Sequence, residues 1–199
     1  MAAHAGRTTH LLYLHGFRSS PASAKARLMA QAVAQRHPQA LWCCPQLPPS
    51  PRQAANDMLH LTADWPRDTM AVVGSSLGGF YASWMARQTG CLSVLLNPAV
   101  FPARDLAKHI GEQSQWHAPQ EHFYFQEGYI AELHAMADEG THAPGPELAL
   151  ISQRDEVLDW REMQARYPKA RCILLPEGDH AISDFSLHVD AVLEFLELV

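Results

Sequence analysis

The chain has 199 residues, a length that suits one domain with a single substantial core better than two. Hydrophobic residues make up 47% and charged residues 18% of it, a balance that argues for a compact globular protein and against a disordered or coiled-coil one. The formal net charge of -6 provides no general attraction to nucleic acid or anionic lipid, so we expect neither as a partner. We predict a single domain over residues 1–199.

Membrane and secretion signals are not found in the sequence. No run of about 18 apolar residues, the length of a membrane-spanning helix, occurs. The N-terminal segment MAAHAGRTTH lacks the apolar stretch and cleavage site of a signal peptide. The cysteines lie in or beside apolar runs, without the paired spacing of a zinc site or disulfide scaffold. We therefore expect no membrane span, a cytoplasmic location and reduced core thiols at Cys43, Cys44, Cys91 and Cys172.

Short apolar runs alternate with helical segments along most of the chain. The runs hardly alternate between apolar and polar residues, as is typical of buried parallel strands, and they occupy residues 11–14, 40–44 (the weakest), 70–73, 92–96, 147–152 and 171–175. Apolar residues at three- and four-residue spacing predict helices over about 22–36, 51–63, 77–89, 158–167 and 184–198. This order predicts an α/β fold, a mostly parallel sheet of about six strands with helices on both faces.

Residues 98–146 interrupt the alternation, because they are far longer than the usual connection between strands. We expect a small cap over the strand ends, in which aromatic residues between about 112 and 130 form an apolar wall. Phe123 and Phe125 are the candidate substrate-binding residues of that wall. The alternative is that this segment adds one or two helices that only complete the core.

Residues 74–78 read GSSLG and match the G-x-S-x-G pattern between an apolar strand and a helical segment. A serine hydroxyl is a poor nucleophile and needs an exposed position on a sharp turn, a base and donors for the oxyanion. Ser76 is the candidate nucleophile, with Gly74 and Gly78 leaving space for the turn. An inactive glycine-rich turn is the alternative for this segment taken alone.

The first predicted strand ends in His15-Gly16-Phe17, where a hydrolase of this kind places a loop that donates to the oxyanion. The backbone amides of Phe17 and Leu77 are therefore the candidate oxyanion hole. His15 precedes the nucleophile, and we expect it to fix this loop by hydrogen bonding.

Two later strands are each followed by a candidate catalytic side chain, Asp155 after the first and His180 after the second. The order serine, acid, histidine is that of an α/β hydrolase. His180 is the candidate general base and Asp155 the acid that orients it. The neighbouring carboxylates of Glu156, Asp159 and Asp179 are the alternatives for the acid.

Other polar residues near the predicted strand ends show weaker patterns. Five histidines of the insertion lack metal-ligand spacing, so we expect neither a metal nor another cofactor: His109, His117, His122, His134 and His142. Arg18, Arg104 and Lys108 are either solvated charges or contacts for an anionic substrate group.

The segments LLYLHGFRSSPASAKA, VVGSSLGGFYA, LLNPAV, SQRDEVLDWR and EGDHAISDF together resemble the YqiA-type esterases, small bacterial α/β hydrolases. The resemblance covers nearly the whole chain and is weakest through residues 112–146. It implies a compact hydrolase fold with a small cap, hydrolysis of carboxylic esters or thioesters, and a triad at Ser76, Asp155 and His180. Gln153-Arg154 depart from the family pattern, which has a small residue before the acid.

The sequence therefore predicts a cofactor-free esterase that forms an acyl intermediate on Ser76 and acts on a small-molecule acyl ester. An acyl-CoA thioesterase with the same triad is the second hypothesis. A hydrolase-fold binding protein without turnover is the third. The sequence assigns no oligomeric state.

Overall fold

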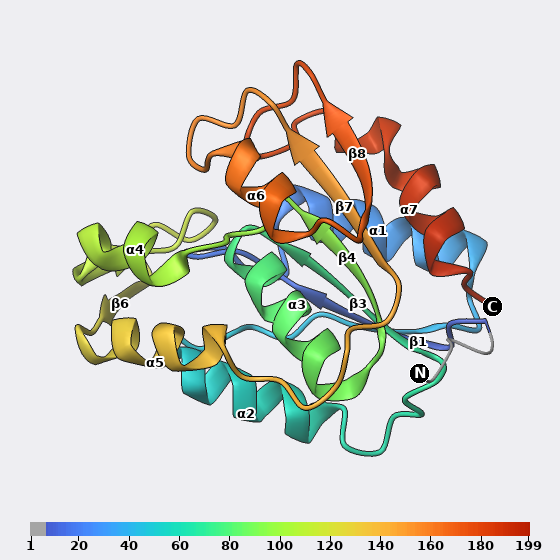
Figure 1. The fold of residues 1–199 in the computed structure, drawn as a ribbon, viewed down its shortest axis with the longest axis horizontal. Helices are drawn as coiled ribbons and strands as arrows, with labels where there is room; N and C mark the ends of the chain where they lie inside the picture. The colour runs from blue at the N-terminus through green and yellow to red at the C-terminus, as the bar shows by residue number, and fades with distance from the viewer. Residues whose placement is uncertain (1–6) are drawn as a thin grey trace.

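A six-stranded parallel sheet forms the centre of the structure, which is a computed structural model that describes residues 7–199 (Figure 1). The strand order is β2-β1-β3-β4-β7-β8, and every neighbouring pair is parallel. The predicted parallel sheet is confirmed. Its strands are β1 (His10–Leu14), β2 (Leu41–Cys43), β3 (Met70–Ser75), β4 (Leu92–Leu96), β7 (Glu147–Ser152) and β8 (Arg171–Leu175).

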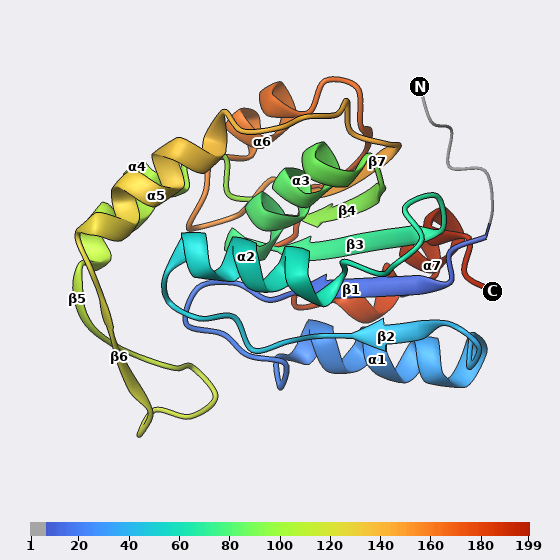
Figure 2. The same ribbon diagram turned by 90° about the horizontal axis from the view of Figure 1, so that it is seen from below.

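Helices cover both faces of this sheet (Figure 2). One face carries α1 (Ala24–Arg36) and α7 (Val189–Leu196); the other carries α2 (Pro51–Leu61), α3 (Leu77–Thr89) and α6 (Trp160–Arg166). Alternate residues of β1 enter the two cores, since Leu12 and Leu14 pack on the α3 face and Leu11 and Tyr13 on the α1 face. A strand buried on both faces has no polar face, which explains its unbroken apolar run.

The helices predicted over 158–167 and 184–198 differ most from the structure. Asp159 caps α6 by accepting a hydrogen bond from the Arg161 amide, so this helix begins at Trp160. The segment predicted as one helix over 184–198 is a 3₁₀ helix, Phe185–Leu187, followed by α7. It ends early because Glu197 has a φ of 47°, after which Leu198 forms a bridge with Thr8.

The long insertion divides into a projecting part and a packed part. Its hairpin extends from the body of the molecule beyond the carboxyl ends of β1 and β3, whereas α5 packs on α2 and α4 and buries Leu133 and Met136 (Figure 2). The insertion therefore both projects beyond the strand ends and completes the core. Its elements are α4 (Pro102–Leu106), a 3₁₀ helix (Ala107–His109), β5 (Gly111–Ser114), antiparallel β6 (His122–Phe125) and α5 (Gly128–Ala137).

The cysteines differ in their exposure. All four are free thiols, with Cys91 buried and Cys43 and Cys44 half-buried. The expectation of a core position is wrong for Cys172, which is exposed because it lies on the edge strand β8.

Within residues 7–199, no helix is both long and apolar enough to cross a membrane. The expectation that there is no signal peptide concerns the N-terminal segment. Residues 1–6 of that segment lie outside the described part of the chain.

We predict that Phe125→Ala lowers the free energy of unfolding by about 3–5 kcal/mol, because a buried ring is replaced by a cavity. Phe125 is 1% exposed and its ring lies 5.1 Å from that of Phe17 and 5.4 Å from that of Tyr129, between centroids. Tyr124→Ala is the matched control, since the neighbouring Tyr124 is 62% exposed. Urea unfolding measures both variants, and equal losses would contradict the assignment of Phe125 to the core.

Candidate active site

Ser76 occupies a strained turn between the end of β3 and the start of α3. Its φ of 58° lies in the left-handed region, which a residue with a side chain adopts only when its surroundings impose it. The surroundings do so through the backbone. The Ser76 amide donates to the Leu96 carbonyl at 2.9 Å, and the Ser76 carbonyl accepts from the amides of Gly79 and Ala99 at 2.8 and 3.0 Å.

The two glycines of the motif are required by close packing. A Cβ atom on Gly74 would lie 1.9 Å from the Gly78 carbonyl oxygen, and one on Gly78 would lie 2.0 Å from the Leu14 carbonyl oxygen. No side chain fits at either position, so the start of α3 rests directly on β1 and β3. This contact sets the position of Ser76 relative to the sheet.

A chain of hydrogen bonds connects three side chains that are distant in the sequence. His180 Nε2 lies 3.0 Å from Ser76 Oγ, and His180 Nδ1 lies 2.8 Å from Asp155 Oδ2. The Asp155 side chain is fully buried, and its Oδ1 accepts the amides of Val157 and Leu158, both at 2.8 Å. With Asp155 as acceptor, Nδ1 carries the proton and Nε2 is free to accept the proton of Ser76.

The other carboxylates near this chain bind elsewhere. Glu156 accepts the backbone amide of His180 at 3.0 Å, and Asp159 caps α6. Asp179 accepts the amide and the hydroxyl of Ser183, and these hydrogen bonds lower the pKa of Asp179. Among residues 7–199, Asp155 is thus the one carboxylate bonded to the ring of His180.

The backbone amides of Phe17 and Leu77 lie close to Ser76. Gly16 touches it, since a Cβ atom on Gly16 would lie 3.2 Å from Ser76 Cβ, and Phe17 follows directly. Leu77 is the first residue of α3, whose amino-terminal amides have no partner within the helix. Neither the Phe17 nor the Leu77 amide has an acceptor within the described part of the chain, so both can donate to an oxyanion.

His15 fixes the loop that carries Phe17, as expected from the sequence. It is 4% exposed, its Nδ1 lies 3.0 Å from the Gly16 carbonyl oxygen, and its Nε2 accepts the Leu47 amide at 3.1 Å. Burial lowers the pKa of His15 and favours the neutral ring, which this pair of hydrogen bonds requires. His15 therefore joins the loop after β1 to the segment after β2.

Asn97, to which sequence reasoning gave no role, connects the acid and histidine loops. Its side chain is fully buried; Oδ1 accepts the Ser152 amide at 2.8 Å, and Nδ2 contacts Ser152 Oγ at 2.9 Å and the carbonyls of Asp179 and His180 at 3.0 Å each. Asn97 itself has a φ of 43°. A polar residue directly after the buried strand β4 was the available signal, since buried polar groups are bonded and usually have a structural purpose.

Two clefts open at Ser76 and His180. The first, the α1 cleft, has a volume of about 440 Å³ and lies between the start of α1 and the loop after His180; its polar walls include Ser19, Ser23, Lys25, His117 and Ser183. The second, the α4 cleft, has a volume of about 330 Å³; its apolar walls include Leu77, Ala99, Pro102, Leu106, Val157 and Leu158, and the charged side chains of Arg18, Asp105 and Lys108 line it as well. Trp116 and Phe17 border both clefts.

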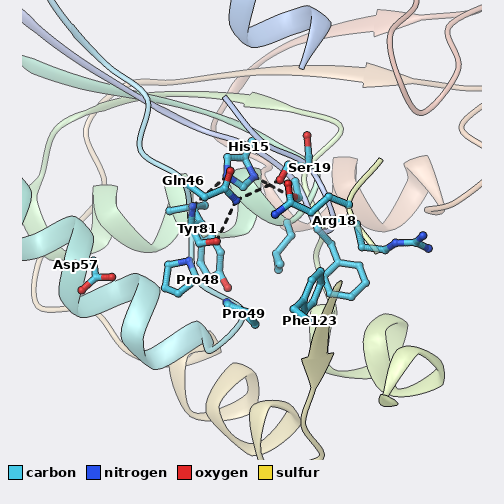
Figure 3. A pocket seen from close by; sticks show the side chains of 14 residues that line it. His15, Arg18, Ser19, Gln46, Pro48, Pro49, Asp57, Tyr81 and Phe123 are labelled. Carbon is cyan, nitrogen blue, oxygen red and sulfur yellow. Dashed lines mark hydrogen bonds between the residues drawn. The ribbon is translucent and has the colours of Figure 1, made fainter. Parts of the chain in front are cut away.

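The expected aromatic wall over Ser76 needs correction. Phe123 and Phe125 lie on one face of β6 and pack edge-on against Phe17, with ring centroids 5.9 and 5.1 Å away. Phe125 is buried there. Phe123 lines a third cavity of about 360 Å³ beside Gln46, Pro48, Pro49 and Tyr81, whose lining does not include Ser76 or His180 (Figure 3). Of the aromatic residues of the hairpin, Trp116 is the one that reaches the two clefts.

The basic residues singled out from the sequence occupy different environments. Arg104 forms a two-pronged ion pair with Glu162 and is not among the residues that line the clefts. Arg18 donates to the Ser114 carbonyl at 2.7 Å and lies 4.1 Å over the ring of Trp116, so it holds the hairpin against the body of the protein. Lys108 lines the α4 cleft. Lys25, which the sequence analysis did not single out, lines the α1 cleft.

The histidines of the insertion are dispersed. His122 pairs with Glu112 at 3.3 Å, His109 packs on Phe17 and His142 contacts Thr141. In residues 7–199 no three histidine, cysteine or acidic side chains are grouped in a way that could hold a metal ion.

The model of the UPF0227 family, described as an uncharacterised protein family, matches residues 10–197. The chain belongs to this family. The resemblance drawn from the sequence is thereby confirmed, and the match to UPF0227 extends over nearly the whole chain.

Solved structures similar to this UPF0227 protein are α/β hydrolases. Mouse alpha/beta hydrolase domain-containing protein 10 has a TM-score of 0.67 at 17% identity, over 96% of this chain and 92% of that chain. Est1E from Butyrivibrio proteoclasticus, in a structure with bound ferulic acid, has a TM-score of 0.68 at 14% identity, over 96% and 87%. The Pyrococcus furiosus esterase Pf2001 has a TM-score of 0.64 at 16% identity, over 96% and 82%. The predicted α/β-hydrolase fold is confirmed.

We predict that Asn97→Ala lowers the free energy of unfolding by about 3 kcal/mol or more, because the Ser152 amide and the His180 carbonyl lose a buried partner. Asn56→Ala is the control, since Asn56 is exposed on α2 and its loss should cost within about 0.5 kcal/mol. Denaturant unfolding followed by tryptophan fluorescence measures both. A loss at Asn97 no larger than that at Asn56 would show that its hydrogen bonds do not stabilise the loops.

Proposed function

We propose that the protein hydrolyses carboxylic esters through an acyl intermediate on Ser76. The observation that carries the proposal is the continuous hydrogen-bonded chain from Asp155 through His180 to Ser76 beside two unpaired amides. A nucleophile, a base, an orienting acid and oxyanion donors are the groups that acyl transfer requires. The similarity in fold to esterases supports the same reaction class.

In the first half of the reaction, Ser76 Oγ attacks the ester carbonyl carbon while His180 Nε2 takes the serine proton. The carbonyl oxygen becomes an oxyanion that the amides of Phe17 and Leu77 bind. His180 then gives its proton to the leaving alcohol as the carbon–oxygen bond breaks, which leaves an acyl group on Ser76. In the second half a water molecule takes the place of the alcohol, and the carboxylic acid leaves with Ser76 restored.

Asp155 acts through His180. Its buried carboxylate holds the proton on Nδ1, so that Nε2 faces Ser76, and it stabilises the imidazolium that forms between the two proton transfers. The amides of Val157 and Leu158 hold the other carboxylate oxygen and prevent the acid from turning away.

The α4 cleft is the place for the acyl chain in this proposal. Its apolar walls adjoin Ser76 and Leu77, and each methylene group buried there would contribute about 0.8 kcal/mol to binding.

A panel of p-nitrophenyl esters and acyl-CoA thioesters tests oxyester against thioester hydrolysis, since the same triad serves both.

We expect Ser76→Ala to lower ester turnover by at least about a thousandfold, because the loss of one member of a triad removes the covalent route. The variant should also lose labelling by a fluorophosphonate probe, which reacts with activated serines. Ser75→Ala is the neighbouring control and should lose less than about tenfold, since Ser75 is the last residue of β3 and takes no part in the hydrogen-bonded chain. Wild-type protein that neither labels nor turns over would instead indicate a binding protein.

The acid is tested by a ranking of three variants. Asp155→Asn should lower kcat/KM at least about a hundredfold more than Glu156→Gln or Asp179→Asn, because the carboxylate bonded to Nδ1 fixes the catalytic tautomer. The two controls remove carboxylates that bind backbone amides close by. Circular dichroism verifies that each variant is folded, and a reversed ranking would assign the acid to another carboxylate.

A further inference from the structure

The α1 cleft contains a cation that the proposed reaction does not use. Lys25 lies in the first turn of α1 and lines the cleft together with Ser76 and His180. Its ammonium group donates one hydrogen bond to the Ala181 carbonyl. A lysine ammonium has three N–H donors, so two remain for a ligand.

The surroundings of Lys25 leave its charge available. No aspartate or glutamate is among the residues that line the α1 cleft. The nearby carboxylates are engaged, Asp155 with His180 and Asp179 with Ser183. Burial lowers the pKa of Lys25 to about 8, against the attraction of these two carboxylates. Burial destabilises the charged form of the ammonium group. An anion bound in the cleft would stabilise that charged form again.

Backbone and hydroxyl donors face the same space. Helix α1 is 13 residues long, and the amides of Ala24 and Lys25 in its first turn have no acceptor in the described chain. The positive end of the helix dipole therefore adds to the charge of Lys25. Ser19 and Ser23 also line the cleft and have hydroxyl groups.

Tyr13 adds a buried polar group to the surroundings of the cleft. It comes from β1, lines the α1 cleft and is 0% exposed, yet its hydroxyl has no hydrogen-bond partner among residues 7–199. Burial raises the pKa of Tyr13, so the phenol keeps its proton and is a donor. Buried hydroxyl groups are normally bonded, so this unpartnered phenol is an exception among the residues that line the cleft.

We infer that the α1 cleft binds an anionic group, a carboxylate or a phosphate, carried by the ester that Ser76 cleaves. This inference rests on the proposed function and names its substrate class, an ester with one apolar and one anionic part. The apolar part occupies the α4 cleft and the anionic part faces Lys25. Charge-assisted hydrogen bonds of this kind are roughly twice as strong as neutral ones and select for the charged substrate.

Matched ester pairs test the inference. On the acyl side, mono-4-nitrophenyl glutarate is compared with neutral 4-nitrophenyl pentanoate; a Lys25 effect in this arm would place the acyl group in the α1 cleft instead of the α4 cleft. On the alcohol side, 4-acetoxybenzoate and 4-acetoxyphenyl phosphate are compared with phenyl acetate, which separates carboxylate from phosphate. In at least one arm, Lys25→Gln should lower the anionic-to-neutral ratio of kcat/KM by about tenfold or more, the loss of one charge-assisted bond. Lys25→Arg should keep the ratio within about threefold, because the charge remains.

Arg27→Gln is the control for net charge, because Arg27 is exposed on the same helix and does not line the cleft. Its ratio should equal that of the wild type. If Lys25→Gln slows anionic and neutral esters equally in every arm, Lys25 only supports the Ala181 loop and the inference is wrong.

A binding measurement separates this inference from the proposed function. In Ser76→Ala protein, glutarate or phenyl phosphate should raise the melting temperature, and the added Lys25→Gln change should abolish the rise. An anion-dependent rise without turnover of any ester by the wild type would overturn the esterase proposal and retain the anion site. Turnover of neutral esters with neither an anion preference nor a rise would overturn the anion site alone.

Discussion

The left-handed backbone of Ser76 is the constraint on which the site depends. A residue with a side chain adopts that conformation at an energetic cost, and here the amides of Gly79 and Ala99 and the carbonyl of Leu96 hold it in place. The same turn leaves the Leu77 amide unpaired beside the hydroxyl. Because a Cβ atom on Gly74 or Gly78 would overlap backbone atoms, the strand, the turn and α3 form one rigid unit.

The remaining groups reach Ser76 because parallel strands end at the same edge of the sheet. β1 leads to Phe17, β7 to Asp155 and β8 to His180, and each loop begins where its strand ends. Asn97 joins β4 and β7 to the His180 loop, and His15 joins the β1 loop to the segment after β2. Buried polar contacts thus provide the rigidity that backbone pairing in the sheet provides elsewhere.

The two clefts at Ser76 are bounded by different parts of the chain. The α4 cleft is bounded by the insertion and by the loop before α6, which contribute apolar side chains together with Asp105 and Lys108. The α1 cleft is bounded by a helix amino terminus and by a lysine, which contribute positive charge and free amides. Lys25 and the unpaired amides of α1 are our reason for placing the anionic group in the α1 cleft.

The sequence by itself determined the parallel sheet, and its motifs singled out Ser76, Asp155 and His180 as the candidate residues. A strand buried on both faces is a continuous apolar run, and the serine turn needs its glycines at fixed spacing, so both leave local patterns. Packing between distant segments decided the rest. Phe123 and Phe125 were predicted to contact substrate because aromatic content does not reveal which way a hairpin faces; in the structure Phe125 is buried, and Phe123 lines a cavity that does not include Ser76. Asn97, Lys25 and Tyr13 lie in segments that resemble the family but match no catalytic motif; their surroundings come from strands and loops remote in the chain, and only the tertiary structure brings those together.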